Sequence, residues 1–395
     1  MPDTDILNLK FNRNGFGTRA EIREIVKGVY QSQLIREIKQ AGFTKTFGRF
    51  TIHLAQEFGF CYGVDRAVEL AYETCETFPN KRVYLTTEII HNPTVNQDLL
   101  NKGVKFLAGN YKNANSADIT KDDVVIIPAF GTTVTEIRDV YATGCTMVDT
   151  ICGSVINVWK RVEKYAQEGF TSVIHGKYAH EETLATSSRV LEFPEGQYLI
   201  VYDIAQAQKV CDYIVHGGDR NEFLKSFSNA YSQNFDPDVH LQKIGCANQT
   251  TMLSSESLHI AKMLENALAT RFGKAQAVDR FRSFDTICSA TQERQDAIIA
   301  LKAKKPDLVL VVGGYNSSNT THLHEIASSF AKSYHIDRAD CVQDANTLEH
   351  KLFGAKLPIV TNDWLPAGPI SIGITSGAST PNKVLQDVIE RLLEF

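Results

Sequence analysis

From about residue 50 to the C-terminus, short apolar runs rich in β-branched residues alternate with stretches of helical periodicity. The apolar runs end in turn residues and lie at 82–90, 123–131, 171–177, 198–202, 307–314 and 370–377. One intervening stretch shows the i, i+3, i+4, i+7 spacing of a buried helix face, at Val64, Ala67, Val68, Ala71 and Cys75. This alternation predicts an α/β fold with mostly parallel sheets. In such folds ligands bind beyond the carboxyl ends of the strands.

Charge and hydropathy narrow the class of protein. The 395 residues carry a net charge of −5, with Lys and Arg spread along the chain, which argues against a nucleic-acid binder. No run of 18 apolar residues is present, so we expect no membrane span. The N-terminal sequence has neither the apolar segment of a secretory signal nor the acid-poor composition of a transit peptide, so a cytoplasmic location is expected.

Three of the eight cysteines occur at the same kind of position. The tetrapeptide DTIC occurs at 149–152 and again at 285–288, and each copy ends an apolar run and precedes a helical stretch. Cys61 follows a strand-like segment and precedes the helix that starts near Val64. A cysteine at a helix N-terminus meets the positive end of the dipole, which favours the thiolate. Any single cysteine is more often a small buried hydrophobe.

Three widely spaced thiolates suit an incomplete metal site. Cys61, Cys152 and Cys288 are separated by 91 and 136 positions (152 minus 61 and 288 minus 152). Structural zinc takes four ligands, commonly in closely spaced pairs, and electron-transfer clusters take four cysteines. Three cysteines could instead hold three irons of a 4Fe–4S cluster and leave the fourth iron open. The spacing alone does not decide between these sites.

Polar clusters follow the other strands. Hydroxyl and amide side chains lie between a strand and a helix at 316–319, at 249–251 and at 376–380. Such groups at helix N-termini bind phosphates, although one residue of each cluster would also serve as a plain N-cap. His91 and His180 also follow strand-like runs and could donate hydrogen bonds to an anion. Glu181 and Glu182 lie beside His180, and because a carboxylate there would repel a diphosphate, we interpret such a carboxylate as a proton donor or relay.

Seven motifs together resemble the 4-hydroxy-3-methylbut-2-enyl diphosphate reductase (IspH/LytB) family. They are GFCYGVDRA, EIIHNPTVN, HGKYAHEET, NQTTM, DTICSATQERQ, GGYNSSNTTHL and GITSGASTP, and the resemblance runs from about Phe58 to the C-terminus. It implies three α/β domains in a pseudo-threefold arrangement around a central 4Fe–4S cluster. We divide the chain into an N-terminal extension, three α/β domains and a C-terminal helix, at 1–50, 51–152, 153–286, 287–380 and 381–395.

The resemblance also implies residue roles. It makes Cys61, Cys152 and Cys288 the cluster ligands and Glu182 the proton relay, with Thr250 beside it in the catalytic group. By similarity, the diphosphate or the substrate hydroxyl is held by His91, His180, Thr250, Ser317, Ser318, Asn319 and Ser379.

Two positions depart from the family pattern. Phe130 stands where the shorter bacterial members have a diphosphate-contacting histidine, and Gly153 follows Cys152 where proline is common. Phe130 and the long N-terminal part resemble the plant- and cyanobacteria-like branch.

The reaction implied is reductive dehydroxylation of the allylic diphosphate to isopentenyl and dimethylallyl diphosphate plus water. It is the last step of the methylerythritol phosphate route to isoprenoids, with ferredoxin or flavodoxin as the expected electron donor. Two alternatives stay open: a redox-neutral Fe–S hydratase, which would need no electron donor, and a non-enzymatic Fe–S carrier, which would need no phosphate site.

Overall fold

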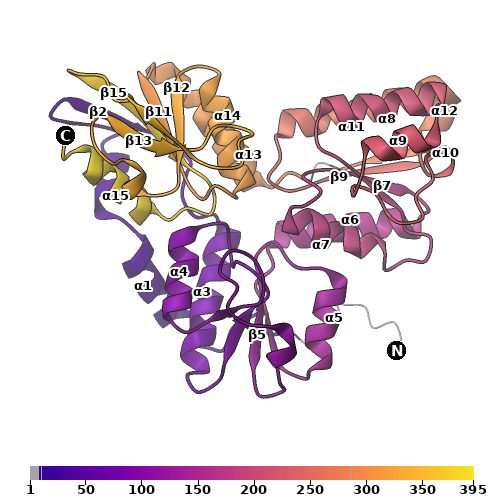
Figure 1. Cartoon of the computed structure of the whole chain (residues 1–395), viewed down its shortest axis with the longest axis horizontal. Helices are drawn as coiled ribbons and strands as arrows, with labels where there is room; N and C mark the ends of the chain where they lie inside the picture. Colours follow the sequence, from indigo (N-terminus) through magenta and orange to yellow (C-terminus); the bar gives the residue numbers. More distant parts are fainter. Residues whose placement is uncertain (1–8, 10, 285) are drawn as a thin grey trace.

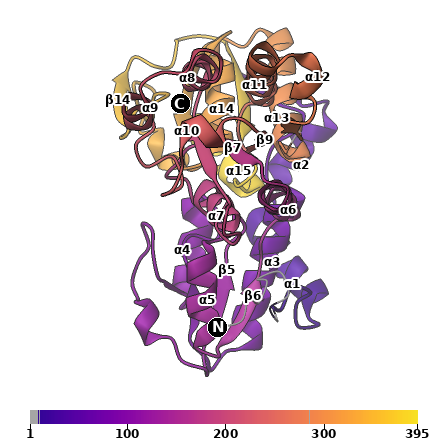
Figure 2. The ribbon, with the colours of Figure 1, turned by 90° about the vertical axis from the view of Figure 1, so that its right-hand side faces the viewer.

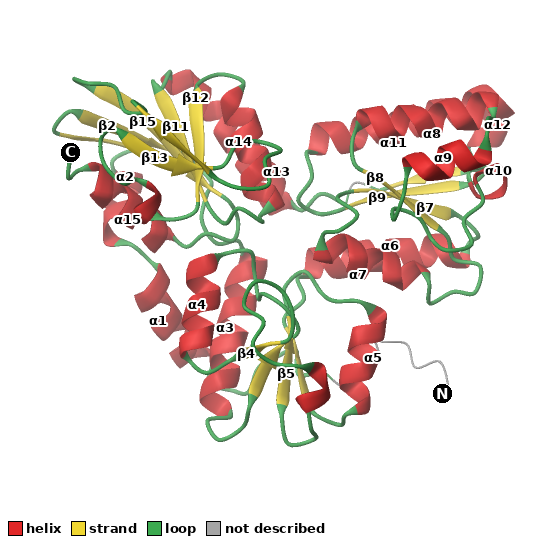
Figure 3. Ribbon diagram, in the orientation of Figure 1, coloured by secondary structure: helices red, strands yellow, loops and turns green. Residues whose placement is uncertain are grey.

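The computed structural model describes residue 9, residues 11–284 and residues 286–395. Residues 1–8 and 10 of the predicted N-terminal extension, and Asp285 of the second DTIC, lie outside the described residues. The described chain forms three sheets of parallel or mostly parallel strands, each flanked by helices, and the three units meet at the centre of the molecule (Figures 1 and 3). This confirms the predicted α/β class. Among the described helices, none combines the length and apolar character needed to cross a bilayer.

The first unit is a four-stranded parallel sheet of order β4-β3-β5-β6. Its strands are β3 (Val83–Leu85), β4 (Lys105–Phe106), β5 (Val124–Ile127) and β6 (Thr146–Asp149). Its helices are α3 (Tyr62–Thr77), α4 (Pro93–Asn101) and α5 (Val134–Ala142). All four residues of β5 are buried, as expected for a parallel strand covered on both faces. Figure 2 shows this unit below the other two.

The second unit has the sheet order β10-β9-β7-β8, again all parallel. Its strands are β7 (Thr171–His175), β8 (Tyr198–Val201), β9 (Ile244–Asn248) and β10 (Phe281–Ser283). Helices α6 (Gly153–Gln167) and α7 (Glu181–Val190) cover one face, and α8 (Ile204–His216) and α11 (Ser254–Phe272) cover the other (Figure 1). Three short helices, α9 (Arg220–Ser226), α10 (Pro237–His240) and α12 (Lys274–Ala277), complete it.

The third unit has the sheet order β1-β2-β15-β11-β12. Its strands are β1 (Thr44–Phe47), β2 (Phe50–Leu54), β11 (Leu308–Val312), β12 (Lys332–Ile336) and β15 (Ile370–Ser376). Its helices are α2 (Gln33–Gln40), α13 (Ser289–Leu301), α14 (Ser318–Ser328) and α15 (Asn382–Leu392). A separate antiparallel hairpin joins β13 (Thr347–His350) to β14 (Ile359–Asn362).

The N-terminal part of the chain is divided between two units. Strand β2 pairs with β15, although the sequence division placed residues 51–54 in the first domain. The difference arises because strand pairing is non-local: the buried, alternating side chains of Phe50, Ile52 and Leu54 complete the core of the third unit. Helix α1 (Arg19–Tyr30) packs instead on α3. The preceding Arg13 forms an ion pair with Asp149 of the first DTIC, at 2.6 Å.

Candidate functional site

The three predicted cysteines occupy equivalent places in the three units. Cys61, Cys152 and Cys288 are the N-cap residues of α3, α6 and α13, and all three have extended backbone angles. Each lies where the chain leaves one sheet and starts a helix of the next unit, after β2, β6 and β10 respectively. The junctions bring the three thiols toward the common centre.

The repeated DTIC has a structural explanation. In the first copy the Thr150 hydroxyl donates to the carbonyl of Ile127 at the end of β5, at 2.6 Å. In the second copy the Thr286 hydroxyl donates to Oδ1 of Asn248 at the end of β9, also at 2.6 Å. Threonine therefore fastens each cysteine turn to the end of the neighbouring parallel strand, so the repeat reflects two equivalent turns.

Arginines connect each of the three helices to the turn of the next cysteine. Arg66 of α3 donates to the carbonyl of Ile151 beside Cys152, at 3.3 Å. Arg294 of α13 donates to the carbonyl of Gly59 beside Cys61, at 2.7 Å. The guanidinium of Arg161 on α6 lies 3.5 Å from the ring centroid of Phe284, before Cys288. These three contacts form a closed ring that fixes the relative positions of the cysteine turns.

The thiols are close neighbours and are mostly buried. A Cβ added at Gly63 would lie 2.6 Å from Sγ of Cys152 and 3.9 Å from Sγ of Cys61. Burial raises the pKa of Cys61, with the nearby Cys152 adding to the rise. Burial also raises the pKa of Cys288 to about 11, against hydrogen bonds from Thr291 that lower it. The expected lowering by the helix dipoles is therefore wrong for Cys61 and Cys288 in the protein alone, because desolvation outweighs the dipole.

This donor set fits a cluster better than a single ion. Two sulfurs on one tetrahedral zinc lie about 3.8 Å apart. The three cysteines do not form a group of ligand atoms within 4.8 Å of one another, whereas His91, His180 and Glu181 do. A polynuclear iron–sulfur centre would accept the wider spacing, because each sulfur binds a different iron. Its positive charge would also ionise the buried thiols.

The other five cysteines do not join this group. Cys75 lies within α3, Cys211 within α8 and Cys246 within β9. Burial raises the pKa of Cys75 and of Cys211 to about 11, which is typical of inert structural thiols. Cys145 and Cys341 bond within their own units, to the carbonyl of Val140 and to the carboxylate of Asp337.

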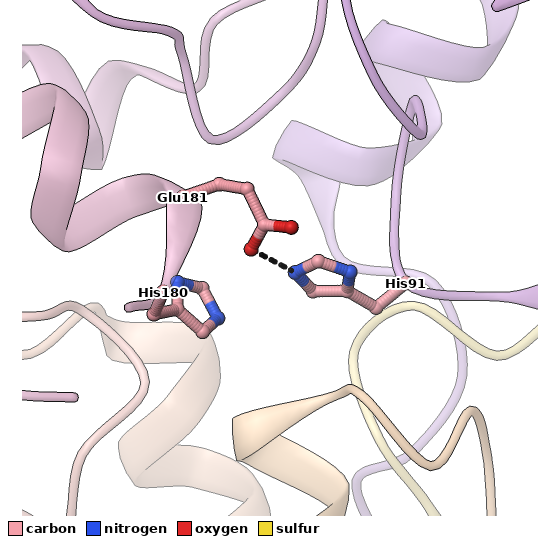
Figure 4. A group of neighbouring side chains, drawn as sticks. All are labelled: His91, His180 and Glu181. Atoms are coloured by element: carbon pink, nitrogen blue, oxygen red, sulfur yellow. Dashed lines mark ion pairs between the residues drawn. The ribbon is translucent and has the colours of Figure 1, made fainter. Parts of the chain in front are cut away.

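His91 and His180 lie side by side, and Figure 4 shows Glu181 reaching toward His91. The two imidazole centroids are 5.2 Å apart, and Oε2 of Glu181 is 3.6 Å from Nε2 of His91. The ring of Phe130 stacks on His91 at 4.6 Å, with 11° between the planes. Phe130 therefore fixes the orientation of an imidazole, although it cannot donate a hydrogen bond itself.

Two buried nitrogens in this region make no hydrogen bond among the described residues. They are Nε2 of His91, whose nearest charged neighbour is Glu181, and Nδ2 of Asn319. The Asn319 Oδ1 accepts from the N–H of Ala378, at 3.0 Å, so its amide nitrogen points the opposite way. The hydroxyl of Ser379 donates to the carbonyl of His91, at 3.2 Å, which brings the 376–380 loop to the histidines. The buried amide nitrogen of Asn319 therefore has an unmet hydrogen bond beside the two histidines, which is a group that an anion could satisfy.

The NSSN cluster divides between capping and binding. Ser317 is the N-cap of α14 and accepts from the N–H of Thr320, so plain capping accounts for its hydroxyl. Ser318 accepts from Nε2 of Gln249, at 3.1 Å, and so joins the third unit to the second. Gln249 also accepts from the hydroxyl of Thr183, at 3.2 Å. Gln249 belongs to the polar cluster predicted at 249–251, but its bonds to two other elements of the fold could not be read from the sequence.

Glu182 and Thr250 form a buried pair. The carboxylate accepts from the Thr250 N–H at 2.6 Å and from its hydroxyl at 3.0 Å. Burial raises the pKa of Glu182 to about 7, although both Thr250 bonds oppose the rise. The Thr250 carbonyl in turn accepts from the N–H of Cys288, at 3.3 Å, so the pair lies directly beside a cysteine turn. A carboxyl group with this pKa can hold and release a proton near neutral pH.

Comparison with known proteins agrees with this geometry. A sequence model of the LytB protein family matches residues 52–393. The chain belongs to the LytB family. Proteins named 4-hydroxy-3-methylbut-2-enyl diphosphate reductase from Microcystis aeruginosa and from a Synechococcus strain are each 50% identical to it. The alignments cover 98% of this chain in both cases, and 94% and 96% of those proteins. Both sources agree with the predicted cyanobacteria-like branch.

Solved structures of the LytB family share the fold. A structure described as "(E)-4-Hydroxy-3-methyl-but-2-enyl Diphosphate Reductase, the Terminal Enzyme of the Non-Mevalonate Pathway" is 25% identical, with a TM-score of 0.52. The match covers 87% of this chain and 99% of that one. A Plasmodium falciparum reductase, 21% identical, has a TM-score of 0.61 over 86% of both chains and supports the fold alone.

The structure also explains the departure at Gly153. This residue is the first of α6, a position that accepts proline well, and a Cβ there would meet no atom within 4 Å. Glycine and proline are thus both compatible with this LytB turn.

Two contacts of His91 were not predicted from the sequence. One is with Glu181, and the other is with Glu88, in which Oε2 of Glu88 lies 3.3 Å from Nδ1 of His91.

Proposed function

We propose that this LytB protein reduces 4-hydroxy-3-methylbut-2-enyl diphosphate to isopentenyl and dimethylallyl diphosphate, with release of water, as the last step of the methylerythritol phosphate pathway. The observation that carries the proposal is that the three cysteine turns come together and that the buried Glu182–Thr250 pair lies directly beside one of them, the Cys288 turn. The names of the half-identical relatives agree with it. A cytoplasmic location, and ferredoxin or flavodoxin as electron donor, belong to the same proposal and rest on family resemblance.

Cys61, Cys152 and Cys288 would hold a 4Fe–4S cluster through three irons. Such a cluster supplies electrons and an open Lewis-acidic iron for the hydroxyl oxygen. The protein around it fixes the sulfurs through the ring formed by Arg66, Arg161 and Arg294.

The diphosphate would be held by His91, His180, Ser317, Ser318, Asn319 and Ser379. Nδ1 of His180 accepts from the N–H of Glu182, so the neutral ring carries its hydrogen on Nε2 and can donate it. Burial keeps His180 neutral, since its pKa lies well below the ordinary value. Nδ1 of His91 faces the Glu88 carboxylate, so an imidazolium at His91, with hydrogens on both nitrogens, would donate from Nδ1 to Glu88 and from Nε2 to a phosphate oxygen. Glu181 is half exposed and would turn outward when the anion binds.

Glu182 would store the proton that the departing oxygen needs. The Thr250 hydroxyl, bonded to Oε2 of Glu182, is placed to pass that proton to the substrate. Overall, two electrons and two protons enter, one C–O bond breaks, one C–H bond forms and water leaves. The diphosphate contacts hold the carbon chain in place during these transfers.

The test is anaerobic reconstitution of the whole chain with iron and sulfide. Cys61→Ser, Cys152→Ser and Cys288→Ser should lose iron and the cluster spectrum, while the matched Cys75→Ser should retain both. Substrate should perturb the spectrum of the intact protein, and turnover should require an added reductant. Full cluster retention in any of the first three variants, or product formed without reductant as in a hydratase, would contradict the proposal.

A further inference from the structure

A positively charged hollow lies on the outside of the cysteine centre. It has a volume of about 540 Å³ and is bounded by α6 and by the described residues around Cys288. Lys160, Arg161 and Lys164 line it from α6, and no acidic residue lies among its described lining residues. Phe284, 47% exposed, adds an aromatic surface. The whole chain has a net charge of −5, so this concentration of cations is local.

The positive surface continues beyond the hollow along the same edge. Arg282 on β10 and Lys243 before β9 both lie over the ring of Phe170, at 5.1 and 4.1 Å from its centroid. Burial raises the pKa of Tyr165 on α6, and the positive charges of both Arg161 and Arg282 oppose that rise. The two arginines therefore act on one side of α6.

Among the described residues, one acidic side chain, Glu168, forms an ion pair with this surface. Oε1 of Glu168 is 3.7 Å from Nζ of Lys164, and the two side chains are 41% and 58% exposed. A solvent-exposed pair of this kind contributes little and is screened by salt.

The hollow reaches the cysteine centre directly. Cys288 forms part of its wall, and Ser154, two residues after Cys152, forms another part. Cys288 is thus reached directly from this side, and the start of α6 just after Cys152 borders the same hollow. An electron arriving at this surface would have a short path to the cluster.

A second cationic hollow, of about 490 Å³, lies beside α1 and near Cys61. It differs from the α6 hollow in having acidic residues in its lining, namely Glu57, Asp65 and Glu69, which would repel an acidic partner. Glu69 pairs with both Arg19 and Arg23, at 3.2 and 2.9 Å. Arg66 and Arg294 there bond to backbone carbonyls of the cysteine turns. The α6 surface is therefore the better candidate for an external anionic partner.

We propose that the surface formed by Lys160, Arg161, Lys164, Lys243 and Arg282 docks an acidic one-electron carrier protein. The inference rests on the proposed reduction, because that reaction needs electrons from outside the chain. Two carriers dock in turn, and each is oxidised by one electron. Both electrons go to the substrate, whose C–O bond breaks while a C–H bond forms and water leaves. Charge complementarity of this kind mainly raises the association rate, and small interfaces are typical of redox encounters.

The test compares two double charge reversals in the reconstituted holoenzyme. Lys160→Glu with Lys164→Glu changes the docking surface and spares Arg161, which holds the Cys288 turn. Lys209→Glu with Lys225→Glu makes the same charge change at exposed lysines on α8 and α9. The probe is a reduced plant-type [2Fe–2S] ferredoxin with an acidic surface. Stopped-flow reoxidation of the probe and calorimetric binding of its oxidised form are measured, with turnover under a small viologen reductant and iron content alongside.

We expect the α6 double variant to lower the association rate with ferredoxin and its affinity by about tenfold or more at low salt. The difference should vanish near 1 M salt, where the Debye length is about 3 Å. Iron content and viologen-driven turnover should not fall. Equal effects of the control pair, or unchanged ferredoxin binding by the α6 variant, would overturn the docking site. Absence of viologen-driven turnover in the unmodified enzyme would instead refute the proposed function, and the calorimetry would still decide the docking.

Discussion

Replacement of Glu182 by glutamine separates proton delivery from substrate binding. Glutamine preserves the shape, and its carbonyl can still accept the Thr250 N–H now bonded at 2.6 Å. The Thr250 hydroxyl, which donates to Oε2 of Glu182, can instead accept a hydrogen bond from the NH₂ group of the glutamine. Glutamine cannot cycle a proton, so turnover should fall by roughly 10²–10⁴, the usual contribution of acid–base catalysis. Substrate affinity and iron content should stay close to those of the unmodified enzyme.

The raised pKa gives this prediction a pH signature. The carboxyl group is protonated below a pKa of about 7, so turnover of the unmodified enzyme should decline as pH rises through 7. The residual turnover of the glutamine variant should not show this decline above pH 7. In the unfolded chain Glu182 ionises near 4.5, so the native state binds the extra proton between 4.5 and 7, and stability falls across that range. The free energy of unfolding should fall by about 3 kcal/mol over this range, at 1.36 kcal/mol per pH unit. The glutamine variant, which has no carboxyl group at this position, should not show this decrease.

The assay is turnover from pH 5.5 to 8.5 under an artificial reductant, with calorimetric affinity and thermal unfolding at pH 5 and 8. Glu181 is an unsuitable control because it lies beside His91, so the exposed Glu195→Gln serves instead. An active Glu182→Gln enzyme, or one whose only defect is weak binding, would refute the proton role. If the turnover of the variant still declined as pH rose through 7, the group that titrates there would be one other than Glu182.

Three further changes test the rest of the site. Asn319→Ala should weaken diphosphate binding by about tenfold or more, because it removes a hydrogen bond to a charged oxygen that contributes about 1.5–3 kcal/mol. Full affinity of this variant in calorimetry would contradict the prediction. Gly63→Ala places a methyl group 2.6 Å from Sγ of Cys152, so iron per chain should drop, and a full cluster would show that the turn can relax. Arg294→Met removes the 2.7 Å bond to Gly59 and should speed cluster loss under chelator, measured by the decay of visible absorbance, while Arg391→Met on α15 should not.

The local features of the site were readable from the sequence. Apolar periodicity and turn residues predicted where strands end and helices begin, so the helix-start positions of Cys61, Cys152 and Cys288 were confirmed. The family resemblance was confirmed over residues 52–393. The ligand and substrate-binding roles of individual residues stay predictions, supported by the convergence described above.

Non-local features could not be read in the same way. The pKa of a thiol depends on how much water its neighbours exclude, so burial reversed the expectation for Cys61 and Cys288. The partners of Arg66 and Arg294 are backbone carbonyls, and these carry no side-chain signal in the sequence. The pairing of β2 with β15 joins residues from opposite ends of the chain, beyond the reach of any local pattern.

The pairing of β2 with β15 also determines when the third unit can fold during synthesis of the chain. Phe50 is paired with Ile370, so about 320 residues (370 minus 50) must be made before β2 finds its neighbour. At 5–20 residues per second, the wait is roughly 15–65 s. During it, the β1-β2 hairpin lacks the strand that will cover its edge, and exposed strand edges invite aggregation. Cys61 follows this hairpin and Cys288 is the N-cap of α13 in the same unit, so the positions of both cysteines depend on the last strand to be made. Iron delivered to a ribosome-bound chain would therefore not find all three cysteines in place.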